Sequence, residues 1–166
     1  MPIKNVVQPD LIYINKNLRL KKYDGNFFQA LLGYQDPYVY QNSEGIFDEG
    51  KKPDLDYIKG MFEWLDNNGE LYFIEAFENN EFIAIGDVTI KEVNPPIAIW
   101  NKDKRGIGIG TLVMKTVIER LKELGVKKIT GSTVYKWNIH SQRLHEKLGF
   151  KCIKEEKDEY VYELVL

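Results

Sequence analysis

Three glycines alternate with isoleucines in residues 105–110, between a short apolar run and a strongly amphipathic stretch. Gly106, Gly108 and Gly110 permit the backbone angles of a tight loop and leave room for a ligand against the main chain. A helix that begins directly after them presents unpaired N–H groups and the positive end of its dipole, which favour a phosphate. Arg105 adds a planar cation beside the loop. The pattern therefore predicts a strand, an anion-binding loop and a helix in succession.

The spacing of the glycines distinguishes among phosphate-binding loops. The nucleoside-triphosphate pattern G-x-x-x-x-G-K-[ST] fails, because Thr111 and Leu112 follow Gly110. The dinucleotide pattern G-x-G-x-x-G fails, because it would need a glycine at position 111. The pattern R-x-x-G-x-G remains, formed by Arg105, Gly108 and Gly110. Taken alone, it also fits a glycine-rich turn that binds no ligand.

A second motif lies downstream, at residues 138–150, and reads N-I-H-S-Q-R-L-H-E-K-L-G-F. Asn138 is suited to cap a helix, and Gly149 is suited to end it in the left-handed conformation. Helix formation explains much of this segment without any ligand. It does not explain why two such segments flank one strand-like run at residues 126–135.

The two motifs together resemble the GNAT superfamily of N-acetyltransferases. The later one matches N-x-x-[SA]-x-x-L-x-x-K-x-G-F, and its string from Ser141 onward is closest in pattern to the ribosomal-protein N-terminal (alanine) acetyltransferase branch. The resemblance is clear over residues 71–150 and thinner upstream. It implies a single α/β GNAT-like domain over residues 1–166, with a mixed, twisted central sheet splayed at its middle and helices on both faces.

The resemblance also implies a cosubstrate, acetyl-CoA, and a site that uses no metal. The residues expected to contact acetyl-CoA come from the strand before the loop, the loop itself and the later helix: Ala98, Ile99, Trp100, Arg105, Gly106, Ile107, Gly108, Ile109, Gly110, Thr111, Asn138 and Ser141. Strand residues would contribute main-chain groups, so residue identity alone does not establish their role. Trp100 fits simple packing on the sheet equally well.

Acetyl transfer to an amine requires a base for the ammonium proton and an acid for the leaving thiolate. Many relatives carry a tyrosine as the acid where this chain has His145; Ser141 is the rival donor, and solvent is the third alternative. No carboxylate lies in residues 97–100, where several relatives place the base, so the general base is not identified. Asp87 and Glu75 each fit either a solvated face of an alternating strand or a carboxyl with a raised pKa.

The leading function is direct transfer of an acetyl group from acetyl-CoA to a primary amine by an N-acetyltransferase, an acyltransferase that transfers groups other than aminoacyl groups. The alternative is a non-catalytic acyl-CoA-binding sensor or interaction module with the same fold. Candidate acceptors are a protein N-terminus, a polyamine and an aminoglycoside-like small molecule. Residues 34–70 are rich in acidic and aromatic side chains, which favours a cationic acceptor, although a solvated face explains the acidic residues as well.

Overall composition argues against nucleic acid or an anionic membrane as a partner, because the net charge is -2 and the pI is near 5.8. The single cysteine, Cys152, cannot form an internal disulfide and is expected to be a small buried side chain in a strand. No run approaches 18 apolar residues, and the N-terminus has no apolar segment of a signal peptide. These features predict a cytoplasmic enzyme. A homodimer is compatible with the sequence, which does not determine the oligomeric state.

Periodicity along the chain predicts an alternation of strands and helices. Strands are expected at residues 18–22, 71–77, 81–93, 97–100, 126–135 and 160–166, and helices at residues 26–34, 54–67, 111–124 and 138–148. Pro37 is expected to end the first helix, and residues 37–53, rich in Gly, Asn, Ser, Asp and Pro, are expected to form a long loop.

Overall fold

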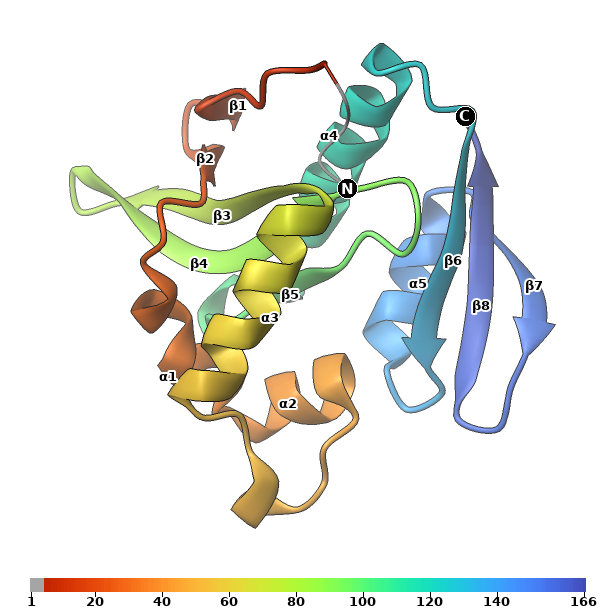
Figure 1. Cartoon of the computed structure of the whole chain (residues 1–166), viewed down its shortest axis with the longest axis horizontal. Helices are drawn as coiled ribbons and strands as arrows, with labels where there is room; N and C mark the ends of the chain where they lie inside the picture. The colour runs from red at the N-terminus through yellow and green to blue at the C-terminus, as the bar shows by residue number, and fades with distance from the viewer. Residues whose placement is uncertain (1–4) are drawn as a thin grey trace.

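A computed structural model describes residues 5–166 as two antiparallel sheets with helices around them (Figure 1). The first sheet has the order β1-β2-β3-β4-β5 and contains Leu11–Asn15, Leu18–Lys22, Glu70–Glu78, Glu81–Ile90 and Ile97–Ile99. The second has the order β6-β8-β7 and contains Lys128–Tyr135 (β6), Lys151–Glu155 (β7) and Glu159–Val165 (β8). The α-helices are α1 (Leu31–Tyr34), α2 (Pro37–Glu44), α3 (Leu55–Asn68), α4 (Ile109–Glu123) and α5 (Ile139–Lys147). None of these helices is long and apolar enough to cross a bilayer.

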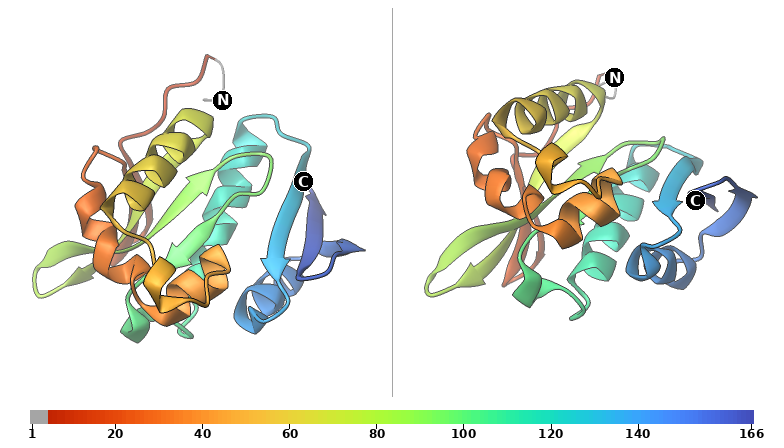
Figure 2. Two further views of the ribbon diagram at one scale, coloured as in Figure 1. Left: turned by 60° about the horizontal axis from the view of Figure 1, so that its bottom comes forward. Right: turned by 90° about the horizontal axis from the view of Figure 1, so that it is seen from below.

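The two sheets separate between β5 and β6, and the first one is covered by helices on both faces (Figure 2). The only parallel contact within residues 5–166 is an isolated bridge between Val93 and Thr130. This arrangement confirms the expected single α/β domain with a splayed sheet and helices on both faces. The arrangement is mixed only through that bridge, because every ladder within the two sheets is antiparallel.

Strand β3 supplies both hydrophobic cores, because successive side chains of a strand point to opposite faces. Leu71 and Phe73 pack toward α3, together with Ile58, Phe62 and Leu65 of that helix. Tyr72 and Ile74 pack toward α4, together with Val113, Met114, Val117 and Leu121 of that helix. The sheet is therefore held between two apolar layers, and the loop after β5 leads directly into α4.

The predicted long loop over residues 37–53 is wrong, because its first half is helix α2. Asp36 caps this helix by accepting a hydrogen bond from the N–H of Tyr38, and Pro37 occupies the first turn, where a missing N–H costs nothing. Gly45, at φ 67°, ends the helix in the left-handed conformation. Pro37 thus begins a helix that was expected to be absent, and α2 brings new side chains beside β5.

Two further expectations are corrected by the structure. Strand β1 was not anticipated, although four of its five residues are apolar or aromatic; it is a half-exposed edge strand paired with β2. Cys152 is exposed and not buried, because β7 is an edge strand whose five residues all face solvent. The helix predicted from Asp54 is confirmed, and Asp54 accepts the capping hydrogen bond from Tyr57.

Candidate active site

The glycine loop ends in an uncapped helix start. Gly106 (φ 71°) and Gly108 (φ 91°) adopt the left-handed conformation, and Gly108 precedes α4 without any side-chain cap. Within residues 5–166, none of the main-chain N–H groups of residues 106–111 donates to a protein acceptor. The first turn of α4 carries no acidic residue. Unused donors and the positive end of a helix dipole together form a binding site for an anion.

A cavity of about 560 Å³ lies beside this loop, between α2, β5 and the first turns of α4 and α5. We call it the cradle cavity. Its charged lining is basic, from Lys104, Arg105, Arg143 and Lys147, and no described carboxylate lines it. It therefore suits a ligand with several phosphate charges. The expected contact residues that line it are Ala98, Ile99, Arg105, Gly106, Gly108, Gly110, Thr111, Asn138 and Ser141.

Three expected contact residues do not line the cradle cavity. Ile107 is 64% exposed, and Ile109 packs against the core beneath α4. Trp100 is buried and packs on the α3 side of the sheet, where its ring lies 5.8 Å from that of Phe73. The side chain of Trp100 is therefore part of the sheet packing, which was the alternative left open for it.

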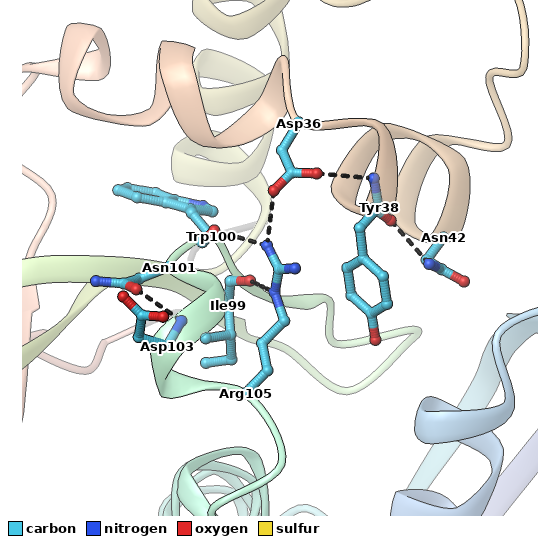
Figure 3. A network of polar contacts seen from close by, with 8 residues as sticks. All are labelled: Asp36, Tyr38, Asn42, Ile99, Trp100, Asn101, Asp103 and Arg105. Atoms are coloured by element: carbon cyan, nitrogen blue, oxygen red, sulfur yellow. Dashed lines mark hydrogen bonds and ion pairs between the residues drawn. The ribbon is translucent and has the colours of Figure 1, made fainter.

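Arg105 makes a network that fixes α2 to the loop (Figure 3). Its Nη2 donates to Oδ2 of Asp36 over 3.2 Å and to the carbonyl of Trp100 over 2.7 Å, and its Nε donates to the carbonyl of Ile99 over 3.0 Å. The guanidinium also lies 4.3 Å from the ring centre of Tyr38. These contacts use the Nε and Nη2 donors of the guanidinium. Arg105 therefore holds the walls of the cradle cavity in position and also adds positive charge to it.

We expect Arg105→Ala to destabilise the protein by about 2 kcal/mol, the scale for losing hydrogen bonds from a partly buried charge. The matched control is Arg143→Ala, because Arg143 lines the same cavity but is exposed and has no ion pair within the described chain. Urea unfolding of both variants measures the difference. Equal stability of the two variants would refute the positioning role of Arg105.

A second cavity, of about 430 Å³, lies next to the first. We call it the Asp87 cavity. The two cavities share the lining residues Asn42, Ser43, Ile97, Ala98, Asn138 and Ser141. Strand β5 and the start of α5 therefore form a common wall, and a molecule in either cavity can reach this wall. The Asp87 cavity is also lined by the carboxylates Glu44, Asp87 and Glu159.

Asp87 is the buried carboxyl of the second cavity, with only 2% of its surface exposed. Its Oδ2 accepts hydrogen bonds from the Tyr34 hydroxyl (2.7 Å) and the Trp100 indole N–H (2.8 Å). Burial raises the pKa of Asp87 to about 7, although these two hydrogen bonds lower it, and nearby Glu44 adds to the increase. Oδ1 accepts no hydrogen bond from residues 5–166. A carboxyl with such a pKa and a free oxygen suits proton transfer near neutral pH.

A β-bulge directs Asp87 toward this cavity. Ile74 pairs with Gly86 and Glu75 pairs with Ala84, so Ile85 is one extra residue on β4. Gly86 is required at the next position, because a Cβ there would lie 2.3 Å from the carbonyl oxygen of Ala98. Sequence reasoning left Asp87 between two alternatives, and the glycine directly before it was the available signal for close backbone packing.

The other ambiguous carboxyl, Glu75, lies outside both cavities. It accepts a hydrogen bond of 2.7 Å from Arg19 and forms an ion pair with it on the neighbouring strands. Glu75 is therefore a structural residue whose charge is paired with Arg19, whereas the buried carboxyl of Asp87 has no cationic partner within residues 5–166.

Ser141 and His145 lie one helical turn apart on α5, and only Ser141 lines both cavities. The Nδ1 of His145 lies 2.7 Å from the Ser141 carbonyl, which can only accept, so Nδ1 carries the proton. Burial lowers the pKa of His145, and its ring packs against Phe150 and Tyr162. His145 is thus a neutral, packed imidazole, whereas Ser141, whose Oγ lies 3.4 Å from that Nδ1, belongs to the wall that the two cavities share.

The acidic character of residues 34–70 has a largely structural explanation. Asp36, Asp48 and Asp54 cap helices, and Glu70 pairs with Arg120. Of the acidic side chains in this stretch, Glu44 alone lines either cavity. The stretch therefore gives much weaker support for a cationic ligand than its composition indicates.

A splayed pair of antiparallel sheets with unused N–H donors at a helix start defines an α/β domain with a binding site for an anionic ligand. Residues 35–150 match the model of the acetyltransferase (GNAT) family. The chain therefore belongs to the GNAT acetyltransferase family. None of the curated proteins is significantly similar to it in sequence.

Solved structures share this fold at low sequence identity. A domain from Methanocaldococcus jannaschii has a TM-score of 0.75 and 24% identity, over 92% of this chain and 100% of that domain. The microcin C7 self-immunity acetyltransferase MccE has a TM-score of 0.71 and 14% identity, over 95% of this chain and 97% of the other. The Salmonella typhimurium protein yncA has a TM-score of 0.66 and 15% identity, over 91% of this chain and 95% of the other. These likenesses support the fold.

Proposed function

We propose that this protein is an acetyl-CoA-dependent N-acetyltransferase that acts on a primary amine. The observation that carries the proposal is the pair of cavities that share a wall at β5: one is basic and lies beside unused N–H groups, and the other contains the buried carboxyl of Asp87. The structures of MccE and yncA were solved with acetyl-CoA, which supports the same coenzyme here.

The cradle cavity fits acetyl-CoA by its donors and its charge. The N–H groups of residues 106–111 would hold the pyrophosphate, with Lys104 and Arg143 close to the remaining phosphate charge. Acetyl-CoA, when bound, supplies the acetyl thioester. The main chain of Ala98 and Ile99 lies at the wall of the cavity, in a position to orient the acetyl end.

Asp87 serves as the general base in this proposal. Its free Oδ1 accepts a proton from the ammonium of the acceptor, which gives the nitrogen the lone pair that it needs to attack the acetyl carbonyl. The hydroxyl of Ser141 donates a proton to the sulfur as the carbon–sulfur bond breaks. The second proton of the attacking nitrogen passes through solvent to restore the hydroxyl, and Asp87 releases its own proton to solvent, so that a neutral amide and a thiol leave. Tyr34 and Trp100 position Asp87 through its other oxygen.

Ser141→Ala is expected to lower kcat by about 10²-fold, at the low end of general acid catalysis, because the coenzyme thiol is itself a fair leaving group. His145→Phe is expected to retain kcat within about threefold, because the imidazole is neutral and packed. Steady-state kinetics on both variants separates the two residues. A loss in His145→Phe alone would assign the acid to His145, and near-normal kcat in both and in the double variant would assign it to solvent.

Thiol release from acetyl-CoA in the presence of amines and N-terminal peptides tests the proposed function. Release that depends on the acceptor supports a transferase, with the product identified by mass spectrometry. Binding of acetyl-CoA with no release on any acceptor would instead favour the rival function, an acyl-CoA-binding sensor or interaction module. The free Oδ1 of Asp87 in a cavity favours the enzyme, because a sensor needs no base there.

The finer features follow from the sequence motifs. The match after Ser141 to the ribosomal-protein N-terminal acetyltransferases supports a protein N-terminus among the acceptors, and the composition supports a cytoplasmic location. A homodimer stays a prediction that size-exclusion chromatography with light scattering tests.

A further inference from the structure

One lysine lines the Asp87 cavity. Lys91 directly follows β4, and among the described residues that line this cavity it is the only lysine or arginine. His145 also lines the cavity, but burial lowers its pKa and keeps it neutral near pH 7. The carboxylates Glu44, Asp87 and Glu159 account for the remaining charges. The cavity therefore offers binding groups of both signs.

The ammonium of Lys91 has no carboxylate partner within residues 5–166. Its Nζ lies 4.4 Å from the ring centre of Trp64, which also lines the cavity, and burial lowers the pKa of Lys91. By contrast, Lys59 on α3 and Lys136 after β6 pair with carboxylates. The ammonium of Lys91 has therefore lost part of its hydration and has gained only a contact with one aromatic ring. A bound anion would offset the free-energy cost of this lost hydration.

Lys91 and Asp87 are placed to act on one molecule. They are four residues apart along β4 and its extension, so their side chains leave the same face of the sheet, with their Cα atoms about 13 Å apart. The cavity that both residues line also has apolar walls, including Met61, Leu65 and Pro96. A ligand that spans the cavity meets a carboxylate, an apolar wall and a cation.

We infer that the acceptor is a bifunctional molecule, a primary amine that also carries a carboxylate, and that Lys91 binds this carboxylate while the amine faces Asp87. A single lysine matches a single negative charge, which favours a carboxylate over a phosphate. The inference rests on the proposed function and narrows it: an amine with a distant carboxylate is a better acceptor than an alkylamine without a carboxylate, or a polycationic amine, of similar length.

Matched pairs of acceptors test the role of the carboxylate. The acids 4-aminobutanoate, 6-aminohexanoate and 8-aminooctanoate are compared with butylamine, hexylamine and octylamine by thiol release from acetyl-CoA. At the best length, kcat/KM for the acid is expected to exceed that for the alkylamine by about tenfold, the scale of one charge-assisted hydrogen bond. Spermidine serves as the polycationic comparison and is expected to be the poorest acceptor.

Variants of Lys91 assign the preference to this residue. Lys91→Met keeps the apolar stem and removes the charge, so it is expected to reduce the acid-to-amine ratio to about one through a higher KM for the acid. Lys91→Arg is expected to retain the preference, because it retains a cation. Lys59→Met is the matched control on the exposed surface. Calorimetric titration of the best acid into protein loaded with coenzyme A is expected to give the same tenfold loss for Lys91→Met.

The outcomes separate this inference from the proposed function. Equal kcat/KM for acids and alkylamines, or a preference for acids that survives Lys91→Met, would overturn the inference and leave the transferase intact. Acetyl-CoA binding without thiol release for any amine of the panel would overturn both. A selective loss of the acids in Lys91→Met, with alkylamine turnover unchanged, would support both.

Discussion

Asp87→Asn is expected to lower kcat/KM by between about 10² and 10⁴, the range for loss of a general base. The amide is nearly isosteric and its oxygen can still accept from Tyr34 and Trp100, so the site should keep its shape. Wild-type activity should rise with pH through about 7, as Asp87 loses its proton, and the variant should lack this rise. Rate profiles from pH 5 to 9 measure both. Glu75→Gln is the control, because Glu75 lies outside the cavities.

The same variant should gain stability at high pH. The pKa of Asp87 is raised in the folded protein to about 7 from an ordinary 3.8, so folding favours the protonated carboxyl. This preference is fully present below about pH 4, and it is lost as pH rises toward 7, where the buried charge opposes folding by about 4 kcal/mol. Asp87→Asn should thus unfold at higher urea than wild type at pH 8 and at similar urea at pH 4. No difference at pH 8 would mean that Asp87 is solvated.

Gly110→Val is expected to abolish coenzyme binding and leave the fold intact. The backbone at Gly110 is helical, and its added Cβ would lie 3.6 Å from Leu144, an ordinary contact, inside the cradle cavity. Gly108→Val should also abolish binding, but its φ of 91° adds backbone strain, which makes it the less direct test. Calorimetry with acetyl-CoA measures binding, and circular dichroism measures folding.

Gly60→Val is the control for this experiment, because Gly60 is a helical glycine of α3 with open space around it. Arg105→Ala should weaken coenzyme binding only in part, since main-chain donors carry most of the contact. A Gly110→Val protein with normal affinity for acetyl-CoA would remove the cradle cavity from the proposed binding site.

Local patterns predicted the strand, glycine loop and helix in succession. Asn138 marks a helix start by rules that act within a few residues, and α5 begins directly after it; α4 begins at Ile109, two residues before its predicted start. The long apolar strands β3 and β4 were also predicted near their observed bounds. These elements depend on neighbouring residues, which one sequence displays directly.

The parts that sequence reasoning missed depend on distant residues. From the sequence, Pro37 indicates the end of a helix. In the structure, Asp36 caps a new helix, α2, and Arg105, which is 69 residues away in the chain, holds Asp36 in place. Asp87 resembles an exposed member of an alternating strand, because the indole of Trp100 and the hydroxyl of Tyr34 reach it only in the folded chain. Burial of a carboxyl is therefore decided by tertiary packing.

The extra residue at Ile85 determines which face of the sheet Asp87 occupies relative to the residues before it, because side chains alternate between the two faces of a strand. Deleting that residue would restore regular pairing with β3 and move every side chain before it to the opposite face relative to Asp87. An evolutionary insertion or deletion here would exchange a proton acceptor for a core side chain in one step. A chain without this extra residue would need a one-residue gap here to align with this one.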